Sequence, residues 1–235
     1  MKAWVLAALG AAFVFGGAAA PAGPEAPSPA ATTDNLILAN SMQLRRVYLA
    51  PGADFRRFNR VILEPTEVAF ADNWVRDFNR SQRGGSRRLS DRDAERIKND
   101  VSTGMGDTFA RAFRNAGYHV VDHAAPEVLR VQTKVANLSL TAPDLQAAGR
   151  SRTFAENAGE ATLILDVRDS TNNALLGRSL DRRIAGNTRT TMRNSVTNRA
   201  DFQRVFQGWA SASVEDLAAL KAASPVRPGT HPAPR

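Results

Sequence analysis

Apolar side chains recur at helical spacing in two long segments of the chain. In residues 90–116 they form one stripe, and Ser90 is followed three positions later by Asp93, the spacing of a capping box. Gly117 comes next and suits the left-handed backbone found at many helix ends. Residues 198–222 carry a second apolar stripe. We therefore predict two amphipathic helices, each of which buries one face.

A different pattern, alternation of apolar residues with a period of two, indicates half-buried β-strands elsewhere. It is clearest in residues 162–168, where Leu163, Leu165 and Val167 face one way and the residues between them face the other. Residues 170–173 have the composition of a tight turn, so the strands on either side of them form a hairpin. The predicted strands are residues 45–49, 60–70 (interrupted at Pro65), 118–121, 128–140, 162–168 and 174–184.

The order of these elements predicts the fold class. Two strands, a helix, four strands and a second helix follow one another, and the helices must cover one face of a sheet. We predict an α+β protein, a two-layer sandwich in which a mainly antiparallel sheet is covered on one face by two amphipathic helices. Residues 76–88, 142–157 and 189–197 are predicted to be loops or connectors. Alternation within the fourth predicted strand places on one face Leu129, Val131, Thr133, Val135 and Asn137.

The two ends of the chain differ in composition from its middle. Residues 1–20 combine a basic start, an apolar run and small residues, the order typical of a secretory signal peptide. We predict a Pro/Ala-rich linker at 21–35, a single α+β domain at 36–223 and a disordered, proline-rich tail at 224–235. With the signal peptide cleaved, the mature protein is expected to lack a transmembrane segment and to be periplasmic or secreted.

The sequence contains no cysteine, which excludes a disulfide framework, a thiol nucleophile and a lipid-bearing cysteine. His119, Asp122 and His123 are the nearest approach to a group of metal ligands. On a strand, however, the two histidines would lie about 13 Å apart, too far to share one ion. A zinc site also needs three or four converging ligands. We therefore predict no metal site and no cofactor.

The hairpin at residues 159–183 raises a choice between catalysis and structure. It contains Asp166, Asp169 and Asp181, which could be the paired carboxylates of a hydrolase. The arginines nearby would lower the carboxylate pKa values, which does not suit a general acid. The strand pattern instead predicts charges on the solvent face of the sheet, with Asp169 closing the turn. We predict that the protein is not an enzyme and has no catalytic residues.

Arginine is concentrated in one polar segment of a basic protein. The chain has 31 Lys and Arg against 23 Asp and Glu, a formal net charge of +8. Because an exported protein does not meet nucleic acid, we expect a basic segment to face anionic lipid, anionic polymer or an acidic protein. The predicted anion- or partner-binding residues are Arg76, Arg80, Arg83, Arg87 and Arg88.

Three separated phrases of the sequence resemble one protein family. They are VYLAPGADFRRFNRVILEPTEVAF at 47–70, GYHVVD at 117–122 and GEATLILDVRDSTNNALLGRSLDRR at 159–183. In this order they resemble domain-of-unknown-function family 3313, a group of bacterial envelope proteins that are mostly predicted lipoproteins. The resemblance extends over about residues 36–222. It implies a location in the cell envelope and no established activity, cofactor or catalytic residue, and the family's usual lipid-attachment cysteine is missing here.

These observations predict an exported, non-catalytic envelope protein that acts by binding. The first hypothesis is an accessory or adaptor role toward an envelope protein complex, through the exposed sheet face or the Arg-rich segment. The second is direct binding of anionic envelope lipid or polymer through residues 76–88. The third is a hydrolase that uses the Asp cluster.

Overall fold

The computed structural model describes residues 36–39, 43–82, 88–141, 143, 153–155, 158–186, 191–193 and 195–227. The predicted signal peptide and the linker that follows it lie outside these ranges. Within them, no helix combines the length and the apolar character that a membrane span requires.

A large mixed sheet is the centre of the structure. Its strand order is β1-β2-β9-β8-β6-β3-β5, and β4 pairs with β6 beyond the end of β3. From β1 to β6 each pair of neighbours is antiparallel, whereas β3 and β4 run parallel to β6. The strands are β1 (Ile37–Ala39), β2 (Arg46–Leu49), β3 (Arg60–Leu63), β4 (Glu67–Phe70), β5 (His119–Val120), β6 (Val128–Leu140), β8 (Gly159–Asp169) and β9 (Leu175–Ala185).

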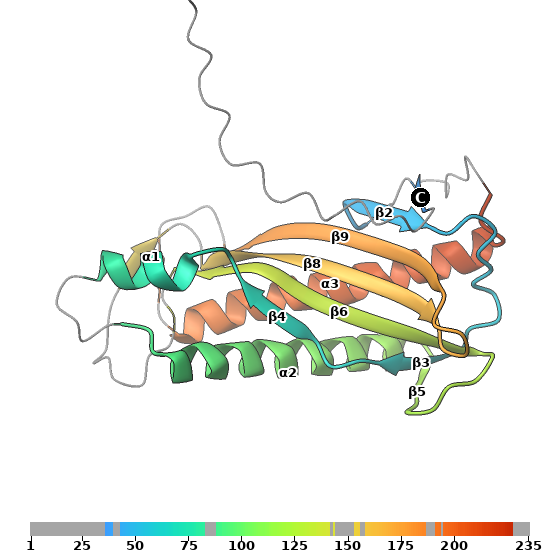
Figure 1. Cartoon of the computed structure of the whole chain (residues 1–235), viewed down its shortest axis with the longest axis horizontal. Helices are drawn as coiled ribbons and strands as arrows, with labels where there is room; N and C mark the ends of the chain where they lie inside the picture. Colours follow the sequence, from blue (N-terminus) through green and yellow to red (C-terminus); the bar gives the residue numbers. More distant parts are fainter. Residues whose placement is uncertain are drawn as a thin grey trace, which may run out of the picture. The chain divides into compact units, whose positions relative to one another are not determined.

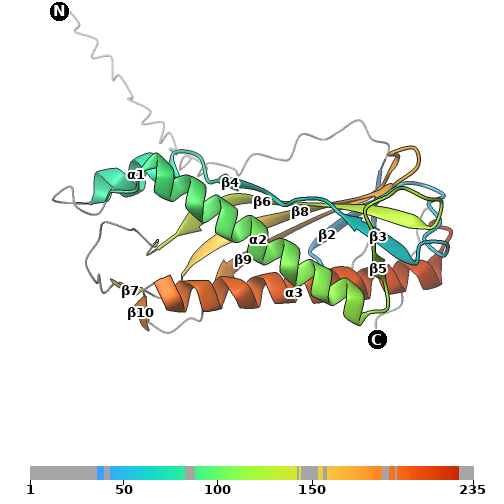
Figure 2. The same cartoon turned by 90° about the horizontal axis from the view of Figure 1, so that it is seen from below.

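Two long helices, α2 (Asp91–Asn115) and α3 (Ser195–Ala223), lie on the same face of this sheet (Figure 1 and Figure 2). α2 connects β4 to the strands β5 and β6, and such a helical crossover returns the chain in the parallel direction. This connection explains why one side of the sheet is parallel. The predicted α+β fold, mainly antiparallel with two helices on one face, is confirmed.

The start of α2 forms as its sequence predicts. Ser90 Oγ accepts a hydrogen bond from the backbone N–H of Asp93, and the Asp93 carboxylate accepts one from the backbone N–H of Ser90. This reciprocal capping box satisfies two backbone donors that the first helical turn would otherwise leave unpaired. Phe109 and Phe113 of the predicted apolar stripe are almost fully buried.

The core fills the space between the helices and the sheet. Trp209 of α3 has no exposed surface, and neither do Phe55 and Phe58 in the segment between β2 and β3. Burial of large aromatic side chains is the main source of stability in a domain of this size. The fully buried large side chains are Trp209, Phe55, Phe58, Phe109, Phe113, Met105, Leu129, Leu138, Leu163, Val61, Val128 and Val131.

An irregularity near the end of β6 changes the predicted alternation of that strand. Asn137 has a φ of 52°, and the pairing of β6 with β8 shifts register between Ala136 and Ser139. The shift turns Leu138 into the core, where the sequence pattern predicted Asn137. The prediction for Asn137 is therefore wrong, because a bulge inserts one residue into the period of two.

Several predicted loops contain regular structure. Residues 76–81 of the predicted loop 76–88 belong to a short helix, α1 (Trp74–Ser81). The predicted connectors contain β7 (Thr153–Ala155) and β10 (Thr191–Arg193), which pair as a separate two-stranded sheet. These three predictions are corrected, since polar composition alone does not exclude a short element.

The segment after α3 continues to pack on the domain. The Val226 N–H donates to the Ala53 carbonyl at 2.8 Å, and the Gly52 N–H donates to the Val226 carbonyl at 2.9 Å. The Phe55 N–H donates to Ser224 Oγ at 2.9 Å. The Val226 side chain is buried. Contacts with the domain therefore extend at least three residues beyond residue 223, and residues 228–235 lie outside the described ranges.

Candidate functional site

Asp166 of β8 lies opposite Arg178 of β9 and is held by a bidentate ion pair. Arg178 donates from Nε and from Nη2 to the two carboxylate oxygens, each at 2.7 Å. Arg168 adds a third hydrogen bond at 3.2 Å. This face of the hairpin is the one turned away from the helices, as the sequence pattern predicted. Both oxygens of the Asp166 carboxylate therefore accept hydrogen bonds from arginines of the same hairpin.

Asp181 of β9 lies on the other face of the sheet, under α3. Its carboxylate accepts a hydrogen bond from Trp209 Nε1 at 3.0 Å and one from Arg183 Nε at 2.8 Å. Asp181 pairs across the strands with the fully buried Leu163. The prediction that the hairpin charges all face solvent is therefore wrong for Asp181 and Arg183, which connect the sheet to α3.

Asp169 ends β8 and closes the turn, as predicted. Its carboxylate accepts hydrogen bonds from the Thr171 backbone N–H at 2.8 Å and from Thr171 Oγ1 at 2.6 Å, and it is paired with Arg57. Burial alone would raise the pKa of Asp169, but the hydrogen bonds from Thr171 and the charge of Arg57 outweigh it and lower the pKa. Asp166 and Asp181 lie on opposite faces of the sheet, so the structure does not bring the three carboxylates together.

The predicted Arg-rich segment is only partly described. Arg76 and Arg80 both lie on α1 and form ion pairs with Asp77. Arg76 Nε lies 2.9 Å from Asp77 Oδ1, and Arg80 Nη1 lies 3.8 Å from the same oxygen. Arg88 is exposed just before α2. Hydrogen bonding to Arg76 lowers the pKa of Asp77. The structure therefore brings Arg76 and Arg80 together around one carboxylate, while Arg83 and Arg87 lie outside the described residues.

The two histidines near β5 are both exposed, His119 on the strand and His123 after it. His123 Nδ1 lies 3.2 Å from an Asp122 carboxylate oxygen, and both side chains are exposed. Within the described ranges, no three His, Cys, Asp or Glu side chains are grouped so that they could hold a metal ion.

A cavity of about 370 Å³ opens between the N-terminal parts of α2 and α3, and we call it the interhelical groove. Its apolar floor consists of side chains from both helices and from the end of β6. The lining residues are Arg96, Ile97, Asp100, Val101, Thr103, Gly104, Asp107, Leu140, Pro143, Asn198, Arg199, Phe202, Gln203 and Phe206. Its volume is within the range of ligand-binding clefts.

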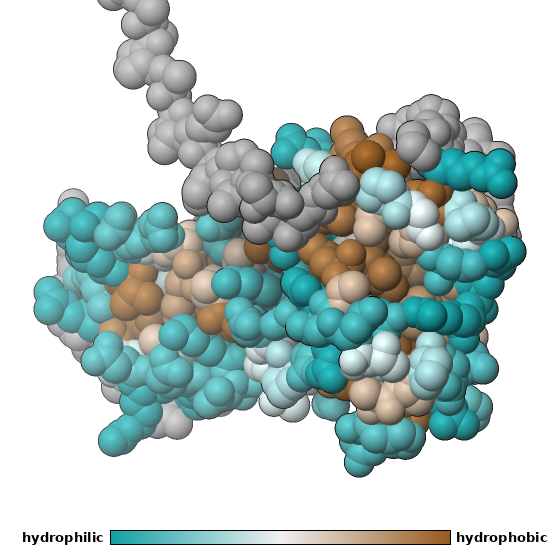
Figure 3. Space-filling view, turned by 45° about the vertical axis from the view of Figure 1, so that its right-hand side comes forward, coloured by the Kyte–Doolittle hydropathy of each residue, from teal (hydrophilic) through white to brown (hydrophobic). Residues whose placement is uncertain are grey.

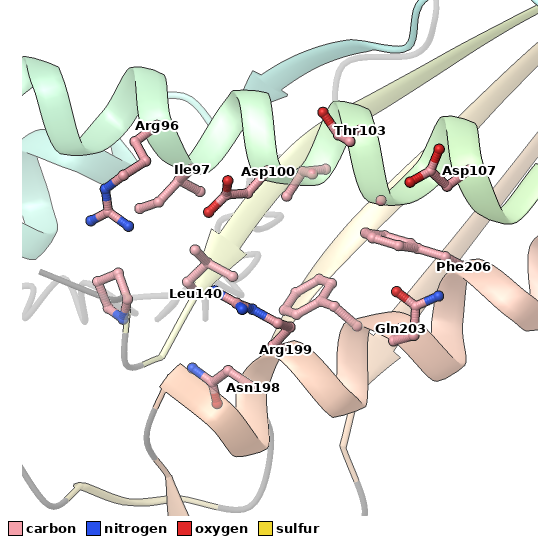
Figure 4. Close-up of a pocket in the computed structure, with 14 residues that line it drawn as sticks. Arg96, Ile97, Asp100, Thr103, Asp107, Leu140, Asn198, Arg199, Gln203 and Phe206 are labelled. Atoms are coloured by element: carbon pink, nitrogen blue, oxygen red, sulfur yellow. The ribbon is translucent and has the colours of Figure 1, made fainter.

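Charged side chains point into the groove from both helices. Asp100 of α2 and Arg199 of α3 extend into the space between the helices, and Arg96 extends into the same end (Figure 4). Arg96 also pairs with Asp93 at 3.1 Å. Among the described residues, Asp100, Asp107 and Arg199 make no ion pair or hydrogen bond through their side chains, and all three are exposed.

The two helices close the groove where they come together. Gln203 Nε2 of α3 donates to Thr108 Oγ1 of α2 at 2.9 Å. A Cβ atom placed on Gly104 would lie 3.8 Å from the Phe206 ring, an ordinary contact distance. An alanine would therefore fit at position 104, which lies at the edge of the groove opposite Phe206.

Sequence reasoning did not find this groove. Asp100 and Asp107 stand seven positions apart, so they lie on the same side of α2, next to the apolar stripe. That spacing was the available signal. In the sequence alone, this side of α2 has the composition of an ordinary solvated helix face. The groove becomes visible only when α3, about a hundred positions later in the chain, lies beside it.

Comparison with known families assigns the chain. A family model described as "Protein of unknown function (DUF3313)" matches residues 34–213. The chain belongs to the DUF3313 family. This confirms the resemblance noted in the sequence, and the match extends from just before β1 into the second half of α3. No curated protein matches the DUF3313 chain.

The chain is also similar, at low sequence identity, to solved structures. The PelC dodecamer from Paraburkholderia phytofirmans is 13% identical with a TM-score of 0.31, covering 70% of this chain and 96% of that chain. A Xanthomonas campestris protein assigned to family DUF330 is also 13% identical, with a TM-score of 0.36, covering 70% of this chain and 84% of that chain.

Proposed function

We propose that this DUF3313 protein is an exported, non-catalytic accessory or adaptor protein of the bacterial cell envelope, and that it binds a partner protein in the interhelical groove. The observation that carries the proposal is a set of charged side chains along an apolar cleft that pair with no described residue: Asp100, Asp107 and Arg199. Apolar area rimmed by charge is the composition of a protein-binding surface.

The state of the hairpin carboxylates supports a role in binding rather than in hydrolysis. Asp166 and Asp181 are each engaged by arginine, and the pKa of Asp169 is lowered. A hydrolase would need one carboxyl group with a raised pKa beside a second one. These three residues instead stabilise the hairpin and its contact with α3.

The predicted signal peptide supports the location. An N-terminal basic, apolar and small-residue sequence directs a protein out of the cytoplasm, and the absence of cysteine removes lipid attachment by a thioether. On this proposal the protein works in the periplasm or outside the cell, on a partner that shares that compartment.

The experiment compares capture of partners by two matched variants. Asp100→Trp fills the groove, while Asn99→Trp places the same side chain on the adjacent exposed position outside it. The tagged proteins are crosslinked in intact envelopes, and the adducts are identified by mass spectrometry. We expect one adduct that is present with the wild type and with Asn99→Trp and lost with Asp100→Trp. Adducts that are the same in all three proteins would overturn the proposal.

A second candidate function, binding of anionic lipid, is favoured by the exposure of the arginines on α1. The side chains of Arg76 and Arg80 are 58% and 75% exposed, and α1 has no buried residue. Figure 3 shows one face of the molecule, on which teal hydrophilic residues surround several brown apolar patches. Arg76→Glu/Arg80→Glu should then abolish binding to phosphatidylglycerol vesicles at low salt, and moderate salt should do the same to the wild type. Binding that persists in both cases would exclude this candidate.

A further inference from the structure

The acidic residues of the interhelical groove form a regular rim. Asp100 and Asp107 are exposed on the same side of α2, and their separation of seven residues corresponds to about 10.5 Å along the helix. Neither carboxylate pairs with another side chain among the described residues. Two carboxylates without partners beside an apolar cleft are complementary to two basic groups at the same spacing.

The opposite side of the groove supplies apolar contacts and one basic residue. Phe202 and Phe206 of α3 are one helical turn apart with ring centroids separated by 6.2 Å, and both line the cavity. Arg199 precedes them on the same helix and points into the groove (Figure 4). An occupant therefore meets an apolar floor, Asp100 and Asp107 along α2 with Arg96 at the end of that rim, and Arg199 on α3.

We infer that the groove binds an amphipathic helix of the partner protein, with two basic residues one heptad apart facing Asp100 and Asp107 and an acidic residue facing Arg199. This inference rests on the proposed function and adds the chemistry of the partner. Side chains seven positions apart lie on one side of a helix, so the partner's basic pair matches the spacing of the acidic pair. Its apolar face packs on Phe202 and Phe206.

Other occupants fit these charges less well. An anionic headgroup could contact Arg96 or Arg199 at one end of the groove, but Asp100 and Asp107 along the rest of α2 would repel it. An extended peptide gains its affinity by adding a strand to an open sheet edge. The walls of this groove are helices, whose backbone hydrogen bonds are already made internally. A bound helix needs no backbone hydrogen-bond partner and can fill the groove with its side chains alone.

The test uses a pair of synthetic helical peptides as probes. Both carry a fluorescent label, a stripe of Leu residues and one Glu near the end that meets Arg199. The basic peptide has two Lys residues one heptad apart, and the control peptide has Glu at those two positions. Binding to the full-length protein is measured by fluorescence anisotropy at low salt. One exposed ion pair changes affinity about 1.4- to 5-fold, so the two Lys residues alone should make the basic peptide bind about 2- to 25-fold more tightly, and repulsion of the two Glu residues in the control adds to this difference.

Charge reversal of the protein provides the decisive comparison. Asp100→Lys/Asp107→Lys should invert the order, so that the acidic peptide binds more tightly than the basic one. Asp72→Lys/Glu215→Lys makes the same change in net charge at exposed residues outside the groove and should leave the order unchanged. All of these positions are exposed, and equal melting temperatures check that the variants fold.

Three results would overturn the inference. The first is equal binding of the two peptides, and the second is an inversion that also occurs in the control variant. The third is saturable binding of dodecanoate, lost in Asp100→Trp, without binding of either peptide, because this outcome assigns the groove to a lipid. If the charge inversion fails while Asp100→Trp still removes the crosslinked partner, the proposed function stands and only the helix is excluded. If the charge inversion fails and Asp100→Trp also keeps the crosslinked partner, both the helix inference and the proposed function are excluded.

Discussion

Two pairs of carboxylates in this protein differ in whether a described arginine forms an ion pair with them. Asp166 and Asp181 on the sheet are nearly buried, and each is held by an arginine of the same hairpin. Asp100 and Asp107 on α2 are exposed and have no such partner within the described ranges. A buried carboxylate is costly unless it is paired, whereas an exposed one contributes little to stability. The first pair therefore serves the fold, and the second remains available for a ligand.

Removing Asp181 should have the largest effect on stability. Asp181→Ala leaves Arg183 and the indole N–H of Trp209 without their acceptor beneath α3. Because Arg183 can still reach water, we expect a loss of about 3 kcal/mol, at the lower end for a broken buried pair. Urea unfolding at neutral pH measures it. A loss below about 1 kcal/mol would show that α3 does not depend on this contact.

Asp169 should make a smaller contribution that depends on pH. Asp169→Asn weakens the pairing with Arg57 and is expected to cost about 1–2 kcal/mol at pH 7. The pKa of Asp169 is lowered in the folded protein, so its stabilisation is complete above the unfolded value of about 3.9 and disappears as pH falls through the folded value. Urea midpoints of the two proteins should therefore converge in acid. A constant difference down to pH 2 would contradict this assignment.

Breaking the ion pair between Asp166 and Arg178 should destabilise the protein less than removing Asp181. Arg178→Met removes the bidentate partner of Asp166, but Arg168 still donates to the same carboxylate. We expect a loss of about 1 kcal/mol in urea unfolding, since Asp166 keeps a charged donor and can gain water. Adding Arg168→Met should increase the loss by more than that variant costs alone. Simple additivity of the two changes would show that the arginines act independently.

The carboxylates of the groove should have almost no effect on folding. Asp100→Asn/Asp107→Asn is expected to leave the free energy of unfolding within about 0.5 kcal/mol of the wild type. The same variant should lose the preference for a basic peptide, because the acidic rim is neutral. A loss of more than about 1 kcal/mol would show that Asp100 and Asp107 stabilise the fold, as Asp181 does, and would contradict the distinction between the two pairs of carboxylates.

The long elements could be predicted from the sequence because their signals are local. Ser90 and Asp93 cap α2 through contacts three residues apart, and the alternation in β6 gives its bounds. Short elements lack such signals. β1 has three residues and exists through its pairing with β2, and α1 is an eight-residue helix in a segment with a loop-like composition. In both cases the element is too short for a hydrophobic period to be recognised in the sequence.

The faces of the hairpin illustrate a second limit. In β9, leucine and arginine occur at both parities, so the strand alone does not indicate which side is buried. Pairing with β8 decides it, because Asp181 comes to lie opposite Leu163 and beneath Trp209. The groove has the same origin. Its walls come from α2 and α3, and neither wall is distinguishable from a solvated helix face until the two are placed together.

The strap formed by Ser224 and Val226 has a practical consequence for handling the protein. It fastens the end of α3 to the segment before β3, so a fusion partner or affinity tag joined directly at residue 223 would displace it. Reporters should be attached after Arg227, with a flexible spacer. Placed there, they leave both the strap and the cleft at the other end of α3 undisturbed.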